Sequence, residues 1–406
     1  MRILLINNFF RDVGGVERVF FIERDLLHTH GHEVIDFSTE HPANYPSSYS
    51  KFFVSGVDFY APGHLLKKAA RFFYSFEVAR KLNALIDETK PEVAHIQGIF
   101  DALGPTVVSV LRRRKIPIVF TTHAYKLVCP NGRLFAHGHV DDLCKKNILN
   151  DVFGATVQNS FVKSLWAALA LASNRARGIF SAFDRIISPS MFLIHQHTEF
   201  GWPAEKFLHV PNPIDITKFS VQPSEDSYML FVGRLVEEKG VEMLVEAARE
   251  LPNIPLKIIG DGPLMQKLLE RVREIGAINI SFEGAQSPEN VRAYFKNAAA
   301  VIVSSICYEN DPYSVLEAQA SGKVVIAAYS GGIPEQIREG ETGFLFERGN
   351  VVGLAAAMRH IWGLKPQERA KIGLQARAFV DTVRDPELYY EVLTGILGCL
   401  LDKIGN

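Results

Sequence analysis

The feature that most constrains the fold is an alternation of short apolar runs with helix-patterned segments. In the first half, helix-like stretches at 16–28 and 105–113 alternate with apolar runs at 3–7, 33–37, 93–96 and 118–122. Such alternation implies a parallel sheet covered by helices on both faces. The apolar N-terminus is too short for a signal peptide and is interpreted as the first buried strand.

The same alternation restarts after a polar, aperiodic stretch at 220–227, which is interpreted as a linker. Apolar runs at 228–232, 256–259, 280–282, 301–304 and 324–327 form the second series. We therefore predict two facing Rossmann-like, doubly wound α/β domains that bind ligands in a cleft at the carboxyl ends of their strands. The expected boundaries are 1–218 and 219–384, followed by a closing helix at 385–406.

Composition excludes several classes of protein. A chain of 406 residues is too long for one ordinary core. The net charge of −1 gives no case for nucleic acid as a partner. Four scattered cysteines favour a reducing cytoplasm over a disulfide framework. No run approaches the roughly 18 apolar residues of a membrane span.

The segment 304–322 combines a strand exit with a helix start. Glu309 lies in the loop that leaves the apolar run at 299–303, and Pro312 suits the first turn of the next helix. A helix N-terminus carries about half a positive charge and attracts anions. The segment therefore predicts an anion site beside a carboxylate.

Main-chain donors and carboxylates are expected to share this site. The N–H groups of Tyr313, Ser314 and Val315 are expected to point outward and hold a phosphate. Glu309 and Glu317, eight positions apart, can accept hydrogen bonds from sugar hydroxyls. The pattern indicates a sugar joined to a phosphate; the alternative is two solvated charges at a helix end.

Two further strand ends carry residues of the kinds that bind phosphate groups. Arg234 follows the run at 228–232 and Lys239 precedes Gly240, so two cations face a strand end where they can hold a diphosphate. Gly14 and Gly15 follow the first strand and open a helix, which lets the backbone approach a phosphate. The alternatives are surface ion pairs for the cations and a plain tight turn for the glycines.

The end of the fourth strand carries His123, which can contact a sugar hydroxyl or line an acceptor site; the alternative is a satisfied histidine near the sheet. The loop that follows is expected to be a lid or an acceptor-specificity loop. A zinc site formed by Cys129, His137, His139 and Cys144 is the weaker alternative, because their spacing is irregular and no C-x-x-C occurs. No metal site is therefore assigned.

Aromatic and basic residues alternate in the amphipathic segment 64–90, and a second basic cluster lies at 112–115. This combination permits docking to a membrane surface. The alternative is a set of core helices with solvated polar faces.

Residues 309–318 resemble the E-N-x-P-x-S-V-L-E-A variant of the Glu-x7-Glu segment in retaining GT-B glycosyltransferases of family 4, and 233–240 match that family's G-R-x(4)-K-G motif. The family usually has Asp after the Thr-x-His of 121–123, where this chain has Ala124. That departure removes one expected carboxylate. The resemblance covers nearly the whole chain and is more specific in the second half.

The resemblance implies metal-independent transfer of a sugar from a UDP- or GDP-linked donor to a saccharide or lipid-linked acceptor, in the cytoplasm or at the inner membrane face, with no cofactor. By hypothesis Arg234 and Lys239 bind the diphosphate, Glu309 the donor sugar and Glu317 the ribose. Gly15 would allow acceptor and phosphate to approach, and His123 would touch sugar or acceptor. A sugar-nucleotide epimerase and a non-catalytic nucleotide-sugar-binding protein remain the alternatives.

Overall fold

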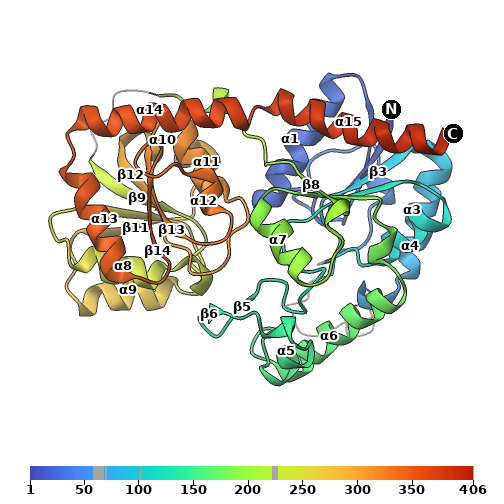
Figure 1. Ribbon diagram of the computed structural model, residues 1–406, viewed down its shortest axis with the longest axis horizontal. Coiled ribbons are helices and arrows are strands. Elements are labelled where there is room, and N and C mark those ends of the chain that lie inside the picture. Colours follow the sequence, from blue (N-terminus) through green and yellow to red (C-terminus); the bar gives the residue numbers. More distant parts are fainter. Residues whose placement is uncertain (58–67, 69–70, 101, 222–226, 406) are drawn as a thin grey trace. The chain divides into compact units, whose positions relative to one another are not determined.

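The computed structural model describes residues 1–405 except 58–67, 69–70, 101 and 222–226. The chain forms two compact units (Figure 1). The first comprises Met1–Arg133, Asp142–Pro213 and Pro386–Asn406, and the second comprises Leu134–Asp141 and Ile214–Asp385.

The first unit contains a six-stranded parallel sheet in the order β2-β1-β3-β4-β7-β8. Its strands are β1 (Arg2–Ile6), β2 (Glu33–Phe37), β3 (Val93–Ile96), β4 (Ile118–Thr121), β7 (Arg185–Ser188) and β8 (Phe207–His209). The strand order reverses direction between β1 and β3, which makes this the switch point of the sheet.

Helices cover this sheet, as the alternating pattern predicts (Figure 1). The helices of this unit are α1 (Gly15–Thr29), α3 (Phe76–Thr89), α4 (Thr106–Arg113), α5 (Leu149–Phe153), α6 (Phe161–Ala176), α7 (Met191–Glu199) and α15 (Pro386–Gly405). Of these, α5 and α6 pack on each other away from the sheet (Figure 1). Short connections of this unit include η1 (Ser50–Phe52), η2 (Leu143–Lys145), η3 (Phe180–Ala182) and η4 (Ala204–Lys206), and η5 (Ile216–Lys218) opens the second unit. The hairpin β5 (Phe135–Ala136) and β6 (His139–Val140) groups with the second unit.

The second unit repeats the plan with the order β11-β10-β9-β12-β13-β14, all parallel. Its strands are β9 (Tyr228–Val232), β10 (Leu256–Ile259), β11 (Ile280–Gly284), β12 (Ala298–Val303), β13 (Val324–Tyr329) and β14 (Phe344–Glu347). The switch point lies between β9 and β12. Predicted fold class and observed architecture agree.

Two helical layers enclose this second sheet. One contains α8 (Val241–Arg249), α9 (Met265–Glu274) and α13 (Val351–Gly363), and the other α10 (Pro288–Asn297), α11 (Tyr313–Ala320), α12 (Ile333–Gln336) and α14 (Pro366–Val383); η6 (Glu237–Lys239) precedes α8. Alternate side chains of β9 enter opposite cores, since Met229 and Phe231 pack in one and Tyr228 and Leu230 in the other. Burial on both faces explains the continuous apolar runs.

The structure changes unit at Ile214, earlier than the expected boundary after 218. The Ile214 N–H donates to the Arg384 carbonyl at 3.0 Å, and Arg377 donates to the Phe219 carbonyl at 2.8 Å. These bonds tie residues 214–219 to the second unit. The closing helix α15 belongs to the first unit.

Part of the amphipathic segment 64–90, and most of the predicted linker, lie outside the described residues. Arg71, expected on a basic surface, is instead buried and paired with Glu77 at 3.1 Å. The charge of Arg71 is therefore paired inside the protein and does not contribute to a basic surface. Among the described residues, no helix combines the length and apolarity needed to cross a membrane.

Candidate active-site residues

The two motifs of the second unit meet at its switch point. β9 and β12 are paired neighbours, with Phe231 opposite Ile302, so the loops that leave them start side by side. Lys239 Nζ lies 2.5 Å from Glu309 Oε1, and Ser305 Oγ donates to the same oxygen at 2.5 Å. The sequence places both residues in the site, and the structure joins them as an ion pair.

Backbone contacts fix the approach of these loops. The Ile306 N–H donates to the Glu238 carbonyl at 2.9 Å, and Ser304 Oγ donates to the Lys239 carbonyl at 2.8 Å. Gly240 has φ +64°, and a Cβ there would overlap the Ser304 carbonyl. Glycine is required at this position because the backbone is left-handed and the neighbouring chain is too close.

In the Lys239–Glu309 pair, the electrostatic attraction between the two side chains affects their pKa values more than burial does. Burial alone would lower the pKa of Lys239, but the Glu309 carboxylate raises it above its ordinary value. Burial alone would raise the pKa of Glu309, but Lys239 and Ser305 hold it below its ordinary value. Both side chains are therefore charged at neutral pH, which leaves a cation and an anion available to a ligand.

Arg234 is the more accessible cation. Its side chain is 64% exposed and lies 3.6 Å from Glu238 Oε1, and its charge acts on both Lys239 and Glu309. An exposed pair of this kind contributes about 0–1 kcal/mol, so Arg234 can exchange Glu238 for an anionic ligand at little cost.

The start of α11 differs from the prediction. Pro312 is the N-cap, not a residue of the first turn. The Val315 N–H donates to the Pro312 carbonyl at 3.1 Å, because the first turn tightens. The Val315 N–H, expected to hold a phosphate, is therefore already hydrogen-bonded within the turn, and Tyr313 and Ser314 are the first two residues of the helix. Glu317 is half-buried one turn further along α11.

Sequence reasoning missed the contacts that hold the Glu309 loop. Asp311 accepts from Arg384 at 2.8 Å and from Gln336 at 2.7 Å, and all three side chains are buried. No local signal links residues 73 positions apart. The Gly332 N–H donates to the Glu309 carbonyl at 2.7 Å, and Gly331 has φ +64° with no room for a Cβ beside the same carbonyl.

The glycine turn of the first unit lies beside a buried carboxylate. Gly14 and Gly15 are exposed at the start of α1, and Gly14 is extended, so its conformation does not itself require glycine. Glu17, another residue that sequence reasoning missed, accepts from Asn7 at 3.1 Å. Burial raises the pKa of Glu17 to about 6, more than the Asn7 hydrogen bond lowers it.

His123 belongs to a hydrogen-bonded chain at the neighbouring strand ends. Its Nε2 lies 2.6 Å from Gln97 Oε1, and Gln97 Nε2 donates to Glu23 Oε2 at 2.6 Å. Glu23 also accepts from Tyr389 at 2.9 Å and contacts His95 at 2.5 Å. Burial, with a smaller contribution from His95, lowers the pKa of His123 to about 3, so its ring is neutral at pH 7.

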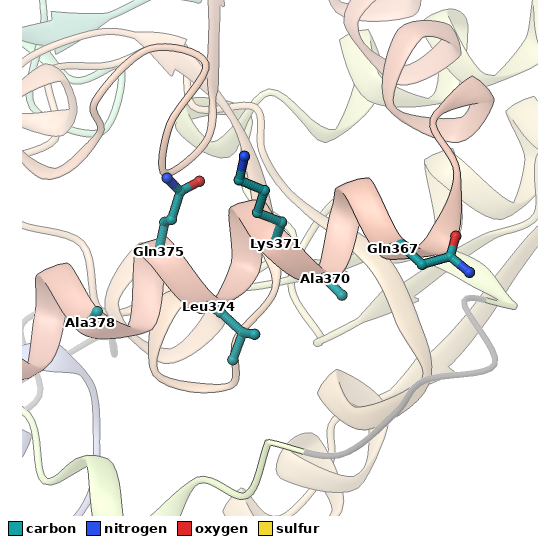
Figure 2. Close-up of a pocket in the computed structure, with 6 residues that line it drawn as sticks. All are labelled: Gln367, Ala370, Lys371, Leu374, Gln375 and Ala378. Atoms are coloured by element: carbon teal, nitrogen blue, oxygen red, sulfur yellow. The ribbon is translucent and has the colours of Figure 1, made fainter.

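The structure also has a surface depression that is lined by none of the candidate site residues described above. Figure 2 shows six residues of α14 lining it: Gln367, Ala370, Lys371, Leu374, Gln375 and Ala378. Because one helix supplies the whole lining, no second element encloses a ligand there.

Two doubly wound parallel-sheet units with polar motifs at their strand ends define a protein of the GT-B class. Its fold matches that of the sucrose-phosphate synthase of Thermosynechococcus elongatus, with a TM-score of 0.73, 17% identity and 99% of each chain covered. Anabaena HepE in complex with UDP and glucose gives a TM-score of 0.67 at 18% identity, covering 98% of this chain and 100% of that one. At these identities the likeness concerns the fold.

The chain belongs to Glycosyltransferase Family 4, whose model matches residues 13–218, half of the chain. Residues 214–379 match the model described as Glycosyl transferases group 1. The family resemblance inferred from the motifs is thereby confirmed.

Curated relatives match over shorter stretches. A lipopolysaccharide 1,2-N-acetylglucosaminetransferase of Salmonella typhimurium is 32% identical over 39% of this chain and 48% of its own length. A GDP-mannose-dependent phosphatidylinositol monomannoside mannosyltransferase of Mycolicibacterium smegmatis is 26% identical over 52% of this chain and 61% of its own length. The matches thus span about half the length of these relatives.

Proposed function

We propose that this protein is a glycosyltransferase that moves a sugar from a nucleotide-diphosphate donor to a saccharide or lipid-linked saccharide. The observation that carries the proposal is the Lys239–Glu309 pair at the switch point of the second unit, with Arg234 within electrostatic range. A diphosphate needs cations and a sugar needs hydrogen-bond acceptors, and this cluster supplies both.

Each charged group has a distinct proposed task. Arg234 and Lys239 bind the diphosphate and stabilise the charge that develops on it as the sugar leaves. Glu309 accepts hydrogen bonds from the donor sugar, and Glu317 from the ribose. The start of α11, at Tyr313 and Ser314, supplies main-chain donors.

The first unit supplies the acceptor side in this proposal. Gly14 and Gly15 are exposed and let acceptor and phosphate come close, and His123 contacts the acceptor or the transferred sugar. Because its ring is neutral at pH 7, His123 acts there as a hydrogen-bonding group and not as a cation.

We further propose that transfer retains the anomeric configuration and uses no metal. Retention would follow from attack on the face from which the nucleotide leaves, with the departing phosphate accepting the acceptor's proton. The cations at Arg234 and Lys239 replace the divalent ion that other transferases use. Proton NMR of the first product formed gives its anomeric configuration, and full turnover without added Mg²⁺ or Mn²⁺ is expected.

One assay separates this proposal from its alternatives. UDP- and GDP-linked sugars are incubated with and without candidate saccharide acceptors, and nucleotide release and sugar epimers are followed. The proposal expects acceptor-dependent nucleotide release. Epimer formation without acceptor would identify an epimerase, and binding without turnover would identify a binding protein. The curated relatives named above are transferases, which favours the first outcome.

Arg234→Ala is the variant that tests the site. Since the side chain is exposed, the fold should stay intact while nucleotide release falls by at least about 100-fold, the equivalent of about 2.7 kcal/mol. Circular dichroism and melting temperature check the fold. Near-normal turnover in this variant would refute the role of the site.

A lipid-linked acceptor is the finer part of the proposal and would place the protein at the inner membrane face. It is supported by the phosphatidylinositol-type acceptor in one relative's name and by exposed apolar side chains along α6. These are Phe161, Val162, Leu165, Trp166 and Leu169. Sedimentation with anionic vesicles should fall in Trp166→Glu, while transfer to a water-soluble acceptor persists. Unchanged sedimentation would remove membrane contact from the proposal.

A further inference from the structure

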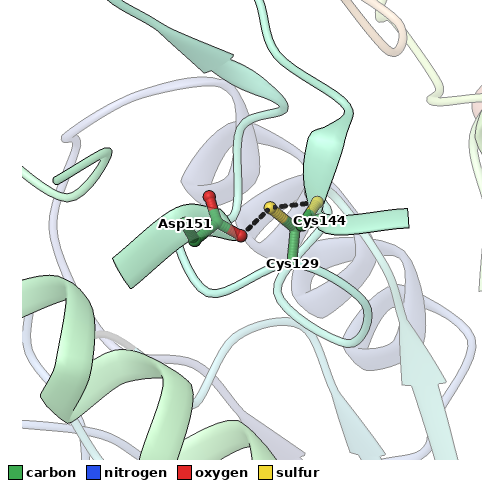
Figure 3. Close-up of side chains that lie close together, drawn as sticks. All are labelled: Cys129, Cys144 and Asp151. Carbon is green, nitrogen blue, oxygen red and sulfur yellow. Dashed lines mark hydrogen bonds between the residues drawn. The ribbon is translucent and has the colours of Figure 1, made fainter. Parts of the chain in front are cut away.

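Two cysteines and an aspartate converge in the irregular region after β4. Figure 3 shows Cys129, Cys144 and Asp151 with their polar atoms turned toward one another. The Sγ atoms of the cysteines are 2.9 Å apart, and Cys129 Sγ lies 3.4 Å from Asp151 Oδ2. All three residues are at most 7% exposed, and both cysteines are free thiols.

The Cys129 thiol faces two oxygen atoms that are hydrogen-bond acceptors. Each thiol has one weak donor, and Cys129 Sγ faces both Asp151 Oδ2 and Asn131 Oδ1, each at 3.4 Å. Thr156 donates to the other Asp151 oxygen at 2.6 Å, which aims Oδ2 at the sulfurs. Asn131 Oδ1 also accepts from the Arg133 N–H at 2.8 Å, and Asp151 Oδ1 accepts from Asn131 at 3.3 Å. The atoms that meet at one point are therefore the two sulfurs and Asp151 Oδ2. A cation at that point would satisfy them together.

We propose that Cys129, Cys144 and Asp151 bind a zinc ion that holds this region of the chain folded. Their ligand atoms all lie within 4.8 Å of one another. A tetrahedral zinc site with bonds of about 2.0–2.3 Å places its ligand atoms about 3.3–3.8 Å apart, which small side-chain movements reach. Asn131 Oδ1 or a water molecule completes the fourth position.

The charges of the surroundings balance such a site. Two thiolates and one carboxylate carry three negative charges, which a zinc ion and the Arg175 guanidinium neutralise. Arg175 donates to the Val128 carbonyl at 3.1 Å and interacts electrostatically with both cysteines. Thiolates favour zinc over magnesium or calcium, which prefer oxygen ligands.

The ligands come from three pieces of chain that are too short to be stable alone. Cys129 lies in a loop, Cys144 in η2 and Asp151 in the five-residue α5. Left-handed backbone recurs just after α5 at Ala155, Gln158 and Asn159, a conformation that is unfavourable for residues other than glycine. A metal cross-link offsets this cost by tying the pieces together.

The ligand set differs from the one considered in the sequence. His137 and His139 lie on the β5–β6 hairpin, which groups with the other unit, and His139 Nδ1 contacts the His137 carbonyl at 3.0 Å. Asp151 takes the place of a histidine, seven residues beyond Cys144. The proposed ion is structural and supplies no step of the reaction.

Zinc content tests the site directly. Tag-free protein, desalted and measured by inductively coupled plasma mass spectrometry, is expected to carry about one zinc per chain. Cys144→Ser and Asp151→Asn should lose most of it. Cys399→Ser is the matched control, because Cys399 is exposed and outside the cluster, and it should keep the wild-type content. Metal-free wild-type protein, or equal zinc in all four proteins, would overturn the proposal.

A second measurement uses the wild-type chain, in case the ligand variants fail to fold. Iodoacetamide should modify Cys399 at once and Cys129 and Cys144 only after 1,10-phenanthroline is added, as followed by peptide mass spectrometry. A chelator-independent rate for the two cluster cysteines, or a disulfide between them in protein purified without reductant, would contradict a zinc site.

Discussion

At the scale of single residues, Gln97 decides how His123 is presented. A carboxylate only accepts hydrogen bonds, so Glu23 requires the amide nitrogen of Gln97 to face it. The amide oxygen must then face His123 Nε2, which therefore carries the ring proton. Nδ1 becomes the acceptor of the ring. Glu23 thus acts through Gln97, in a chain where the family's usual aspartate is replaced by Ala124.

Gln97→Leu should therefore impair turnover without impairing donor binding. Loss of this hydrogen bond removes the acceptor that selects the Nε2–H tautomer of His123, and kcat is expected to fall by about 10-fold or more. The KM for the nucleotide sugar should stay within about 2-fold, because Lys239 and Glu309 lie in the other unit. Steady-state kinetics measure both. A rise in KM with unchanged kcat would contradict a positioning role for Gln97.

Glu17 predicts a pH-dependent contribution to stability. Its pKa is about 6 in the folded protein and 4.5 ordinarily, so the folded state binds the extra proton. The contribution is fully present below pH 4.5 and is lost as pH rises through 6, a difference of about 2 kcal/mol. Glu17→Gln removes this loss, so its stability relative to wild type should rise between pH 4.5 and 7.

Urea unfolding at several pH values measures this difference in the free energy of unfolding. Glu289→Gln is the control, since Glu289 lies at an exposed helix start and its pKa is lowered by its own backbone N–H, not raised. A pH-independent difference between Glu17→Gln and wild type would show that Glu17 does not titrate with a raised pKa.

At the scale of elements, the loop from β12 to α11 is held by the turn that follows β13. Gly331 has φ +64°, and a Cβ there would overlap the Glu309 carbonyl. Gly331→Ala should displace Glu309 and lower kcat/KM by about 10-fold or more. Gly276→Ala is the matched control, with φ +62° and no described atom within 4 Å of an added Cβ. Equal activity in the two variants would remove the proposed coupling.

The Asp311–Arg384 ion pair ties the same loop to the end of α14. Both side chains are at most 5% exposed, so removing one partner leaves a buried charge without its counter-ion. Arg384→Met should lower the free energy of unfolding by about 3–5 kcal/mol, and Asp311→Asn in the same chain should restore part of it. A double-mutant cycle measured by urea unfolding gives the coupling energy, and additive effects would contradict the pairing.

At the scale of the whole molecule, the sequence predicts the two sheets and places most motif residues at strand ends. Continuous apolar runs such as 298–303 identify buried parallel strands because both faces are covered. Contacts between distant residues, such as Asp311 with Arg384 or Glu23 with Tyr389, could not be predicted, since they depend on strand order and helix packing. The prediction that the Val315 N–H points outward was wrong, because the first turn of α11 tightens and this N–H donates to the Pro312 carbonyl.

The last helix, α15, belongs to the first unit, so we predict that substitutions of buried residues in α15 destabilise the first unit. Leu397 is fully buried on α15, whose neighbour in the first unit is α1, whereas Leu388 of the same helix is 46% exposed. Leu397→Ala should destabilise the first unit by about 2–5 kcal/mol, and Leu388→Ala should have little effect. Hydrogen exchange read by mass spectrometry should accelerate in peptides of the first unit and not in those of β9–β14. Because the two units have separate sheets and cores, equal acceleration in both would show that they unfold as one.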